Sequence, residues 1–155
     1  MSAAVDSRDW FEAIALGVPR HTPSRTVTEA DVSLFGGLTG DLSELHLSET
    51  YARTTAFGGR IAHGMLSLSL AHGLVVRTGY LEGTGMALLG WNIVSFRAPV
   101  RIGDTVRARW TTIAKRESRK HTYAGIVTDK IDLILDDGSL AVSGNVTEMV
   151  RRRPV

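Results

Sequence analysis

The sequence predicts an α+β fold in which one curved, mainly antiparallel sheet packs on one long buried helix. Two observations lead to this prediction. Apolar residues in the run 64–76 surround most of the helical circumference, as in a helix that is buried on nearly all sides. The second half of the chain instead alternates apolar and polar residues in segments separated by turns. A chain of 155 residues fits a single domain, for which we expect a core at about 20–149 and a short basic tail at 150–155.

Short helices are expected in the first half of the chain, after an extended start at 25–27. Thr28 can cap a helix as part of a capping box with Asp31, and apolar residues follow at helical spacing over 32–38. Gly40 then ends this helix, and Ser48 can cap another short one. The helix at 64–76 would span roughly 20 Å, a length that a small sheet can wrap.

Strands are predicted in the second half from period-2 alternation and turn signals. Pro99 limits the first of these strands, because proline is poorly tolerated inside a central strand. Asp137-Gly138 is a strong signal for a tight hairpin turn. The expected strands are 91–96, 106–112, 121–135 (with a bend near Gly125) and 140–146.

Composition excludes several classes of protein. The chain has no cysteine, which rules out disulfides, a thiolate zinc site and a cysteine nucleophile. No apolar run approaches the roughly 20 residues of a membrane span, and the polar start at 1–10 is unlike a secretory signal, so a cytoplasmic location is expected. Without aromatic residues interleaved in a basic stripe, nucleic-acid binding is not expected. The run 151–153 of arginines can touch a phosphate or an acidic carrier, but a solvated tail is the prediction.

One carboxylate and one imidazole stand out as an acid–base pair. Asp41 and His46 would lie about 140° apart on a continuous helix, so they converge only if the chain leaves helical geometry, as Gly40 permits. Such a pair meeting over one water can act near neutral pH. By spacing alone, Asp41 can equally cap a turn and His46 can be a hydrogen-bonded loop histidine.

Two motifs resemble the MaoC-like dehydratases and R-specific enoyl-CoA hydratases of the hot-dog superfamily. The segment 40–46 keeps the Asp and His of the family element Gly-Asp-x-Asn-Pro-hydrophobic-His in register. The segment 61–66, Ile-Ala-His-Gly-Met-Leu, is similar to the start of the family's central helix. Further on, 89–96, Pro99-Val100 and Gly103-Asp104 resemble the family's strand and hairpin, so the likeness covers about 20–149.

The resemblance implies a single hot-dog domain that adds water to, or removes it from, the 2,3-bond of an acyl thioester. Asp41 and His46 would be the catalytic acid–base pair, and the backbone N–H of Gly64 would stabilise negative charge on the thioester oxygen. Gly64 is suited to this because it opens an apolar helix, where free N–H groups and the helix dipole favour an anion. The family implies a homodimer acting on acyl-CoA or a carrier-bound acyl group. CoA or phosphopantetheine would belong to the substrate, and neither a metal nor another cofactor is expected.

Residues beside the two motifs are candidates for substrate binding: Ala62, His63, Met65, His72, Trp91 and Asn92. The His63 side chain is expected to be structural rather than catalytic. His72 stands where a simple hydratase of the family has a serine; it is a contact for a polar substrate or a packed helix histidine. Trp91 and Asn92 can form the floor of the acyl pocket. The alternative is that Trp91 packs against the helix.

The sequence also departs from the family between the catalytic residues, where Ser43-Glu44 replaces Asn-Pro. Glu44 is expected to face solvent. Two other functions stay open: a hot-dog acyl-thioester hydrolase, which delivers water to the carbonyl carbon, and a non-catalytic acyl-binding subunit. The retained Asp41 and His46 favour hydration over both.

Overall fold

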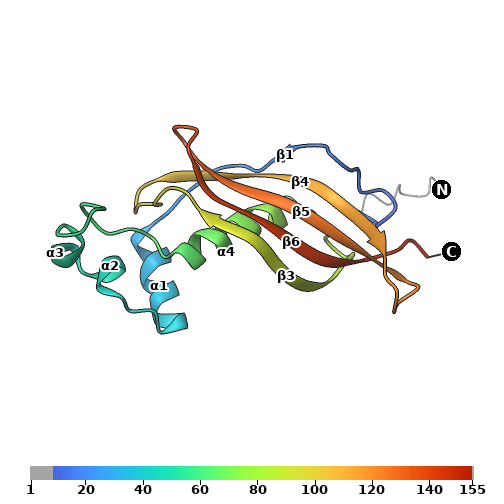
Figure 1. Cartoon of the computed structure of the whole chain (residues 1–155), viewed down its shortest axis with the longest axis horizontal. Coiled ribbons are helices and arrows are strands. Elements are labelled where there is room, and N and C mark those ends of the chain that lie inside the picture. The colour runs from blue at the N-terminus through green and yellow to red at the C-terminus, as the bar shows by residue number, and fades with distance from the viewer. Residues whose placement is uncertain (1–8, 155) are drawn as a thin grey trace, which may run out of the picture.

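The computed structural model describes residues 9–154, so most of the polar start at 1–10 lies outside the described residues. Figure 1 shows the order of the elements along the chain. They are β1 (Arg20–His21), β2 (Arg25–Thr26), α1 (Glu29–Thr39), α2 (Glu44–Leu47), α3 (Glu49–Ala52), α4 (Gly64–Val76), β3 (Gly85–Phe96), β4 (Thr105–Glu117), β5 (Ala124–Leu135) and β6 (Leu140–Arg151).

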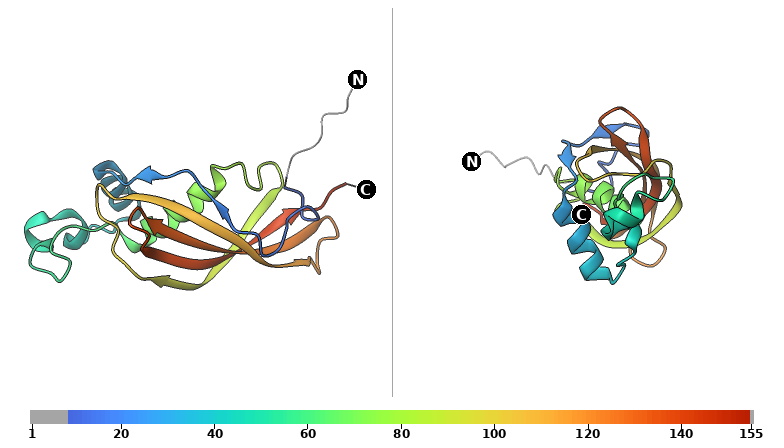
Figure 2. Two further views of the ribbon diagram at one scale, coloured as in Figure 1. Left: turned by 90° about the horizontal axis from the view of Figure 1, so that it is seen from above. Right: turned by 90° about the vertical axis from the view of Figure 1, so that its left-hand side faces the viewer.

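One antiparallel sheet forms the body of the molecule, with strand order β1-β4-β5-β6-β3 and β2 also paired to β4. The sheet curves along α4, while α1 to α3 extend past one end of it (Figures 1 and 2). The predicted α+β class, with one long helix against one curved antiparallel sheet, is therefore confirmed. Among the described residues, no helix is long and apolar enough to cross a membrane.

Helix α4 has the bounds that its apolar run predicts, but its predicted burial on nearly all sides is wrong. Its sheet-facing side is buried through residues such as Leu68, Ala71 and Val75. The opposite side is exposed in the single chain: Met65 retains 57% and Val76 54% of its accessible surface. One sheet contacts a helix from one side only, so a second surface is needed to cover the remainder.

The first, second and fourth long strands extend further than the sequence patterns predict, whereas the third is shorter. The first begins at Gly85 rather than Trp91, because the β3–β6 ladder tolerates register shifts that break the strict alternation. The third begins at Ala124 rather than His121, since the Ser118 hydroxyl accepts the His121 N–H and holds that residue in the preceding turn. The turn at Asp137-Gly138 is confirmed, with Gly138 at a φ of 88°.

The core also includes chain outside the expected limits of 20–149. Phe11 is buried, donates its N–H to the Arg151 carbonyl and lies where a side chain at Gly125 would otherwise be. The prediction of a solvated arginine tail is wrong for two of its residues. Arg151 ends β6, and Arg152 pairs with Glu12 at 2.9 Å. The partners of both arginines, Phe11 and Glu12, come from the N-terminal segment, and local sequence patterns do not reveal these contacts.

A buried carboxylate lies in the sheet opposite α4. Asp129 accepts hydrogen bonds from the Thr112 hydroxyl and, at 2.9 Å, from the Tyr80 hydroxyl. Burial raises the pKa of Asp129 above its ordinary value and outweighs the lowering by these two donors, while nearby Glu148 raises it further. Folding therefore raises the pKa of the Asp129 carboxyl relative to the unfolded chain.

This raised pKa makes a prediction for Asp129→Asn. Because the folded pKa exceeds the unfolded value of about 4, the carboxyl costs stability as pH rises from that value through the folded pKa. The unfolding free energy of the wild-type protein should fall relative to that of the variant over this window. Urea unfolding of both proteins at a series of pH values measures the difference, and a difference independent of pH would contradict the assignment.

Candidate active site

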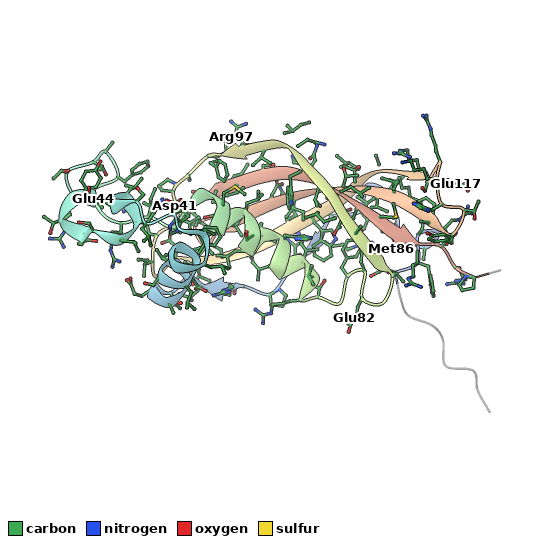
Figure 3. The ribbon with its side chains drawn as sticks, turned by 90° about the horizontal axis from the view of Figure 1, so that it is seen from below. Asp41, Glu44, Glu82, Met86, Arg97 and Glu117 are labelled. Carbon is green, nitrogen blue, oxygen red and sulfur yellow. The ribbon has the colours of Figure 1, made fainter. Side chains whose placement is uncertain are left out.

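Helix α1 and the turn after it position Asp41. The Thr28 hydroxyl accepts the Asp31 N–H, and the Asp31 carboxylate accepts the Thr28 N–H, which confirms the predicted capping box. At the other end Gly40 adopts a left-handed φ of 79° and donates its N–H to the Gly36 carbonyl. The chain thus leaves helical geometry immediately before Asp41, whose side chain is exposed at the end of the molecule shown in Figure 3.

His46 lies on the single turn of α2 and is buried, with 9% of its surface accessible. Its Nδ1 lies 2.8 Å from the Ile61 carbonyl oxygen. Because a carbonyl only accepts, Nδ1 carries the proton and Nε2 keeps its lone pair. Glu44, which replaces the family's proline, is exposed, as expected. Ser43-Glu44 thus stand in place of Asn-Pro, and the hydrogen bond to the Ile61 carbonyl sets the His46 tautomer.

His63 joins these two segments. It is 1% exposed, and its Nε2 donates to the Asp41 carbonyl at 2.9 Å. Its ring packs against that of His46 with the centroids 3.9 Å apart and the planes tilted by 36°, and it is also the N-cap residue of α4. The side chain of His63 thus contacts the backbone of one candidate catalytic residue and the ring of the other, while its backbone begins α4.

The Asp41 carboxylate and the imidazoles of His46 and His63 converge: one atom from each lies within 4.8 Å of the other two. The carboxylate is exposed, whereas both rings are buried. Each ring bonds a backbone carbonyl through one nitrogen, an arrangement that fixes the other nitrogen whether the ring acts as a base or as a metal ligand. The geometry supplies one oriented base beside one carboxylate.

A pocket of about 360 Å³ opens beside His46 at the start of α4. A Cβ placed on Gly64 would lie 3.1 Å from the Phe96 ring, so glycine at this position lets that ring pack closely against the start of α4. No side chain among the described residues caps the N-terminus of α4, so the helix start presents its N–H groups here. The pocket is lined by Leu45, His46, Phe57, Ile61, Ala62, Gly64, Ser67, Phe96, Arg97, Ala98, Pro99, Val100 and Val142.

The candidate binding residues divide between this pocket and other places. Ala62 lines the pocket, whereas Met65 is exposed and does not. His72 lines a second pocket further along α4, and Trp91 packs its ring edge-on against His72. Asn92 is exposed and pairs with Asn145 across the β3–β6 ladder. None of these last three reaches the pocket beside His46.

Sequence reasoning missed several aromatic and polar residues of the pocket. Phe57 and Phe96 carry no motif of their own, and only the fold brings the end of β3 against the start of α4. Ser67 had a weak signal, as a polar residue in an apolar helix; its hydroxyl bonds back to the His63 carbonyl at 3.2 Å.

The chain belongs to the MaoC-like domain family, whose model matches residues 12–133, and its fold is the hot-dog fold of that family. It is 36% identical over 130 residues to an (R)-specific enoyl-CoA hydratase of Rhodospirillum rubrum, covering 84% of each chain. It is 38% identical over 121 residues to an (R)-specific enoyl-CoA hydratase of Aeromonas caviae, covering 78% of this chain and 84% of that one. The crystal structure of a MaoC-like dehydratase from R. rubrum superposes with a TM-score of 0.83 at 28% identity, covering 94% and 99% of the two chains.

The carbonyl partners predict opposite tautomers for the two adjacent histidines. When neutral, His46 should carry its proton on Nδ1 and His63 on Nε2. Long-range ¹⁵N–¹H correlation spectra of histidine-labelled protein, assigned with His46→Gln and His63→Gln variants, report the protonated nitrogen of each ring. The same tautomer in both rings would contradict the geometry.

Proposed function

We propose that this protein is a hydratase/dehydratase that adds water to, or removes it from, the 2,3-bond of an acyl thioester. The observation that carries the proposal is the His46 base, which is oriented by Ile61, lies beside the Asp41 carboxylate and lines the same pocket as Gly64. The names of both relatives, (R)-specific enoyl-CoA hydratases, support the same reaction.

In the hydration direction, Asp41 and His46 hold one water against the β-carbon of a trans-2-enoyl thioester. The water oxygen bonds to that carbon while the pair takes one proton from the water. The electron pair of the double bond moves to give an enolate-like thioester, whose oxygen accepts the N–H of Gly64. The α-carbon then takes a proton from the pair, which restores both residues and yields the 3-hydroxyacyl thioester.

Every atom in these steps comes from the water, the substrate and the chain itself. CoA or phosphopantetheine is therefore written as part of the substrate, and the proposed reaction calls for neither a metal ion nor a redox cofactor.

The protein is proposed to act as a homodimer. Among the described residues, no strand pairs with the outer edge of β3, which carries exposed apolar residues such as Leu88 and Ile93. The exposed strip of α4, formed by Met65, Ser69, Gly73 and Val76, is also uncovered. A second copy would satisfy both the strand edge and the apolar strip.

The catalytic prediction concerns crotonyl-CoA. The wild-type protein should remove the enoyl-thioester absorbance without releasing thiol, and Asp41→Asn and His46→Ala should each lower kcat by about a hundredfold or more, because each removes one member of the acid–base pair. Glu44→Gln is the matched control, since Glu44 is an exposed carboxylate in the same segment. It should retain wild-type turnover.

Two other results would overturn this assignment. Thiol release from crotonyl-CoA would indicate a thioester hydrolase instead. Full hydration by Asp41→Asn or His46→Ala, with circular dichroism unchanged from wild type, would remove the pair from the mechanism.

The dimer prediction uses Ile93, which is 79% exposed on the β3 edge. Ile93→Glu should be harmless to a monomer but should bury a charge in a β3-to-β3 interface. Light scattering on a sizing column should give a dimer for the wild-type protein and a monomer or a weakened dimer for the variant. A monomeric wild-type protein would reject the dimer.

A further inference from the structure

Three potential metal ligands meet where the helical segment contacts the start of α4. The Asp41 carboxylate and the imidazoles of His46 and His63 each place one donor atom within 4.8 Å of the other two. Among residues 9–154, no other His, Asp and Glu side chains form such a group. His72 and Glu148 lie close together further along α4, but no third ligand joins that pair.

The hydrogen bonds of the two rings prepare both of them for a metal ion. His46 donates through Nδ1 to the Ile61 carbonyl at 2.8 Å, and His63 donates through Nε2 to the Asp41 carbonyl at 2.9 Å. In the neutral rings the lone pairs therefore stand on His46 Nε2 and His63 Nδ1. Metal ions bind the lone pair of a neutral imidazole, and histidine ligands commonly donate their other N–H to a backbone carbonyl, as both rings do here.

The lone pair of His63 has no partner within the described part of the chain. The residue is 1% exposed, and no donor among residues 9–154 bonds its Nδ1. Buried polar atoms nearly always have a hydrogen-bond partner, so one that lacks a protein partner points to a bound water or ion. The proposed reaction uses Asp41, His46 and the Gly64 N–H, and it gives His63 Nδ1 no role.

The Asp41 carboxylate supplies the negative charge that a cation requires. It is exposed at one end of the molecule (Figure 3), and no cationic side chain among residues 9–154 pairs with it. An ion between the carboxylate and the two rings would therefore meet an unpaired charge on one side. It would also meet the lone pairs of two oriented nitrogens on the other side.

This donor set suits Zn²⁺. Two imidazole nitrogens and one carboxylate oxygen are typical zinc ligands, and water completes a tetrahedral site. Mg²⁺ and Ca²⁺ prefer sites made only of oxygen atoms. Zinc holds nitrogen ligands at about 2.0–2.1 Å, so neighbouring donor atoms lie roughly 3.4 Å apart. The exposed Asp41 side chain can turn to close the difference from the 4.8 Å limit.

We propose that Asp41, His46 and His63 form an inhibitory binding site for Zn²⁺. The ion occupies the place of the reacting water and takes the Nε2 lone pair of His46, so the base cannot accept a proton. Bound Zn²⁺ therefore blocks hydration and is not a cofactor of it. The inhibition rests on the proposed function, whereas binding of the ion rests on the geometry of the three side chains alone.

Co²⁺ binding tests the site independently of activity, because Co²⁺ accepts similar ligands to Zn²⁺ and absorbs visible light. Full-length protein without a histidine tag, freed of metal by a chelator, should develop a visible band with Co²⁺ that Zn²⁺ abolishes and Mg²⁺ does not. His63→Gln and Asp41→Ala should each weaken Co²⁺ binding by about tenfold or more. His21→Gln is the matched control, since it removes an exposed imidazole outside the group, and it should keep the wild-type affinity.

Circular dichroism shows whether each variant is folded. Asp41→Ala changes an exposed side chain and keeps the test decisive if His63→Gln does not fold. Wild-type affinity for Co²⁺ in folded Asp41→Ala, or no Co²⁺ binding by the wild-type protein, would overturn the site.

Crotonyl-CoA tests the inhibition and separates it from failure of the proposed function. The metal-free protein should hydrate crotonyl-CoA, and saturating Zn²⁺ should lower kcat/KM by about a hundredfold, as for loss of the base, until a chelator restores it. Hydration that is unchanged or raised by saturating Zn²⁺ would overturn the inhibition and leave the hydratase assignment standing. If neither the metal-free nor the Zn²⁺-loaded protein hydrates crotonyl-CoA, the proposed function and the inhibition fail together, while the Co²⁺ result still decides the site.

Discussion

The hydrogen bond from the His63 imidazole to the Asp41 carbonyl joins the helical segment 29–52 to the start of α4. That segment extends past the end of the sheet (Figure 1), so the sheet ladders do not fix its position. Its position depends instead on the packing of Val32, Phe35 and Leu47 against the core and on a few polar bonds. These bonds join His63 to Asp41, His46 to Ile61, and Arg60 to Glu29 and Glu49. Because the His63 backbone also precedes Gly64, the same residue positions Asp41 and His46 relative to the N-terminus of α4.

The two ends and the middle of α4 differ in the groups that they present. The N-terminal end offers backbone N–H groups and glycine, which suit a reacting carbonyl. The middle of the helix is packed on the sheet through small and aliphatic residues, which gives the molecule its stability. The C-terminal end holds a polar pair in an otherwise apolar pocket.

Several features were predictable because they depend on short stretches of sequence. The Thr28–Asp31 capping box, the helix end at Gly40, the Asp137-Gly138 turn and the limits of α4 are local, and all four were predicted correctly. The strand limits were less accurate, since register shifts in the β3–β6 ladder hide the alternation that identifies a strand. The contacts of Phe11 with Gly125 and of Arg152 with Glu12 join residues more than a hundred positions apart, and no local pattern marks them.

By itself, the sequence determined the α+β class, the long central helix and the two motifs that contain Asp41, His46 and Gly64, because periodicity, capping and motif spacing are properties of neighbouring residues. Only the tertiary structure decided which nitrogen of His46 bears the proton, since that depends on the Ile61 carbonyl fifteen residues away. It likewise decided that His63 supports the backbone of Asp41, that one side of α4 stays exposed, and that His72 meets Glu148 across the helix–sheet interface. These outcomes depend on which surfaces face one another after folding, and a linear pattern carries no such information.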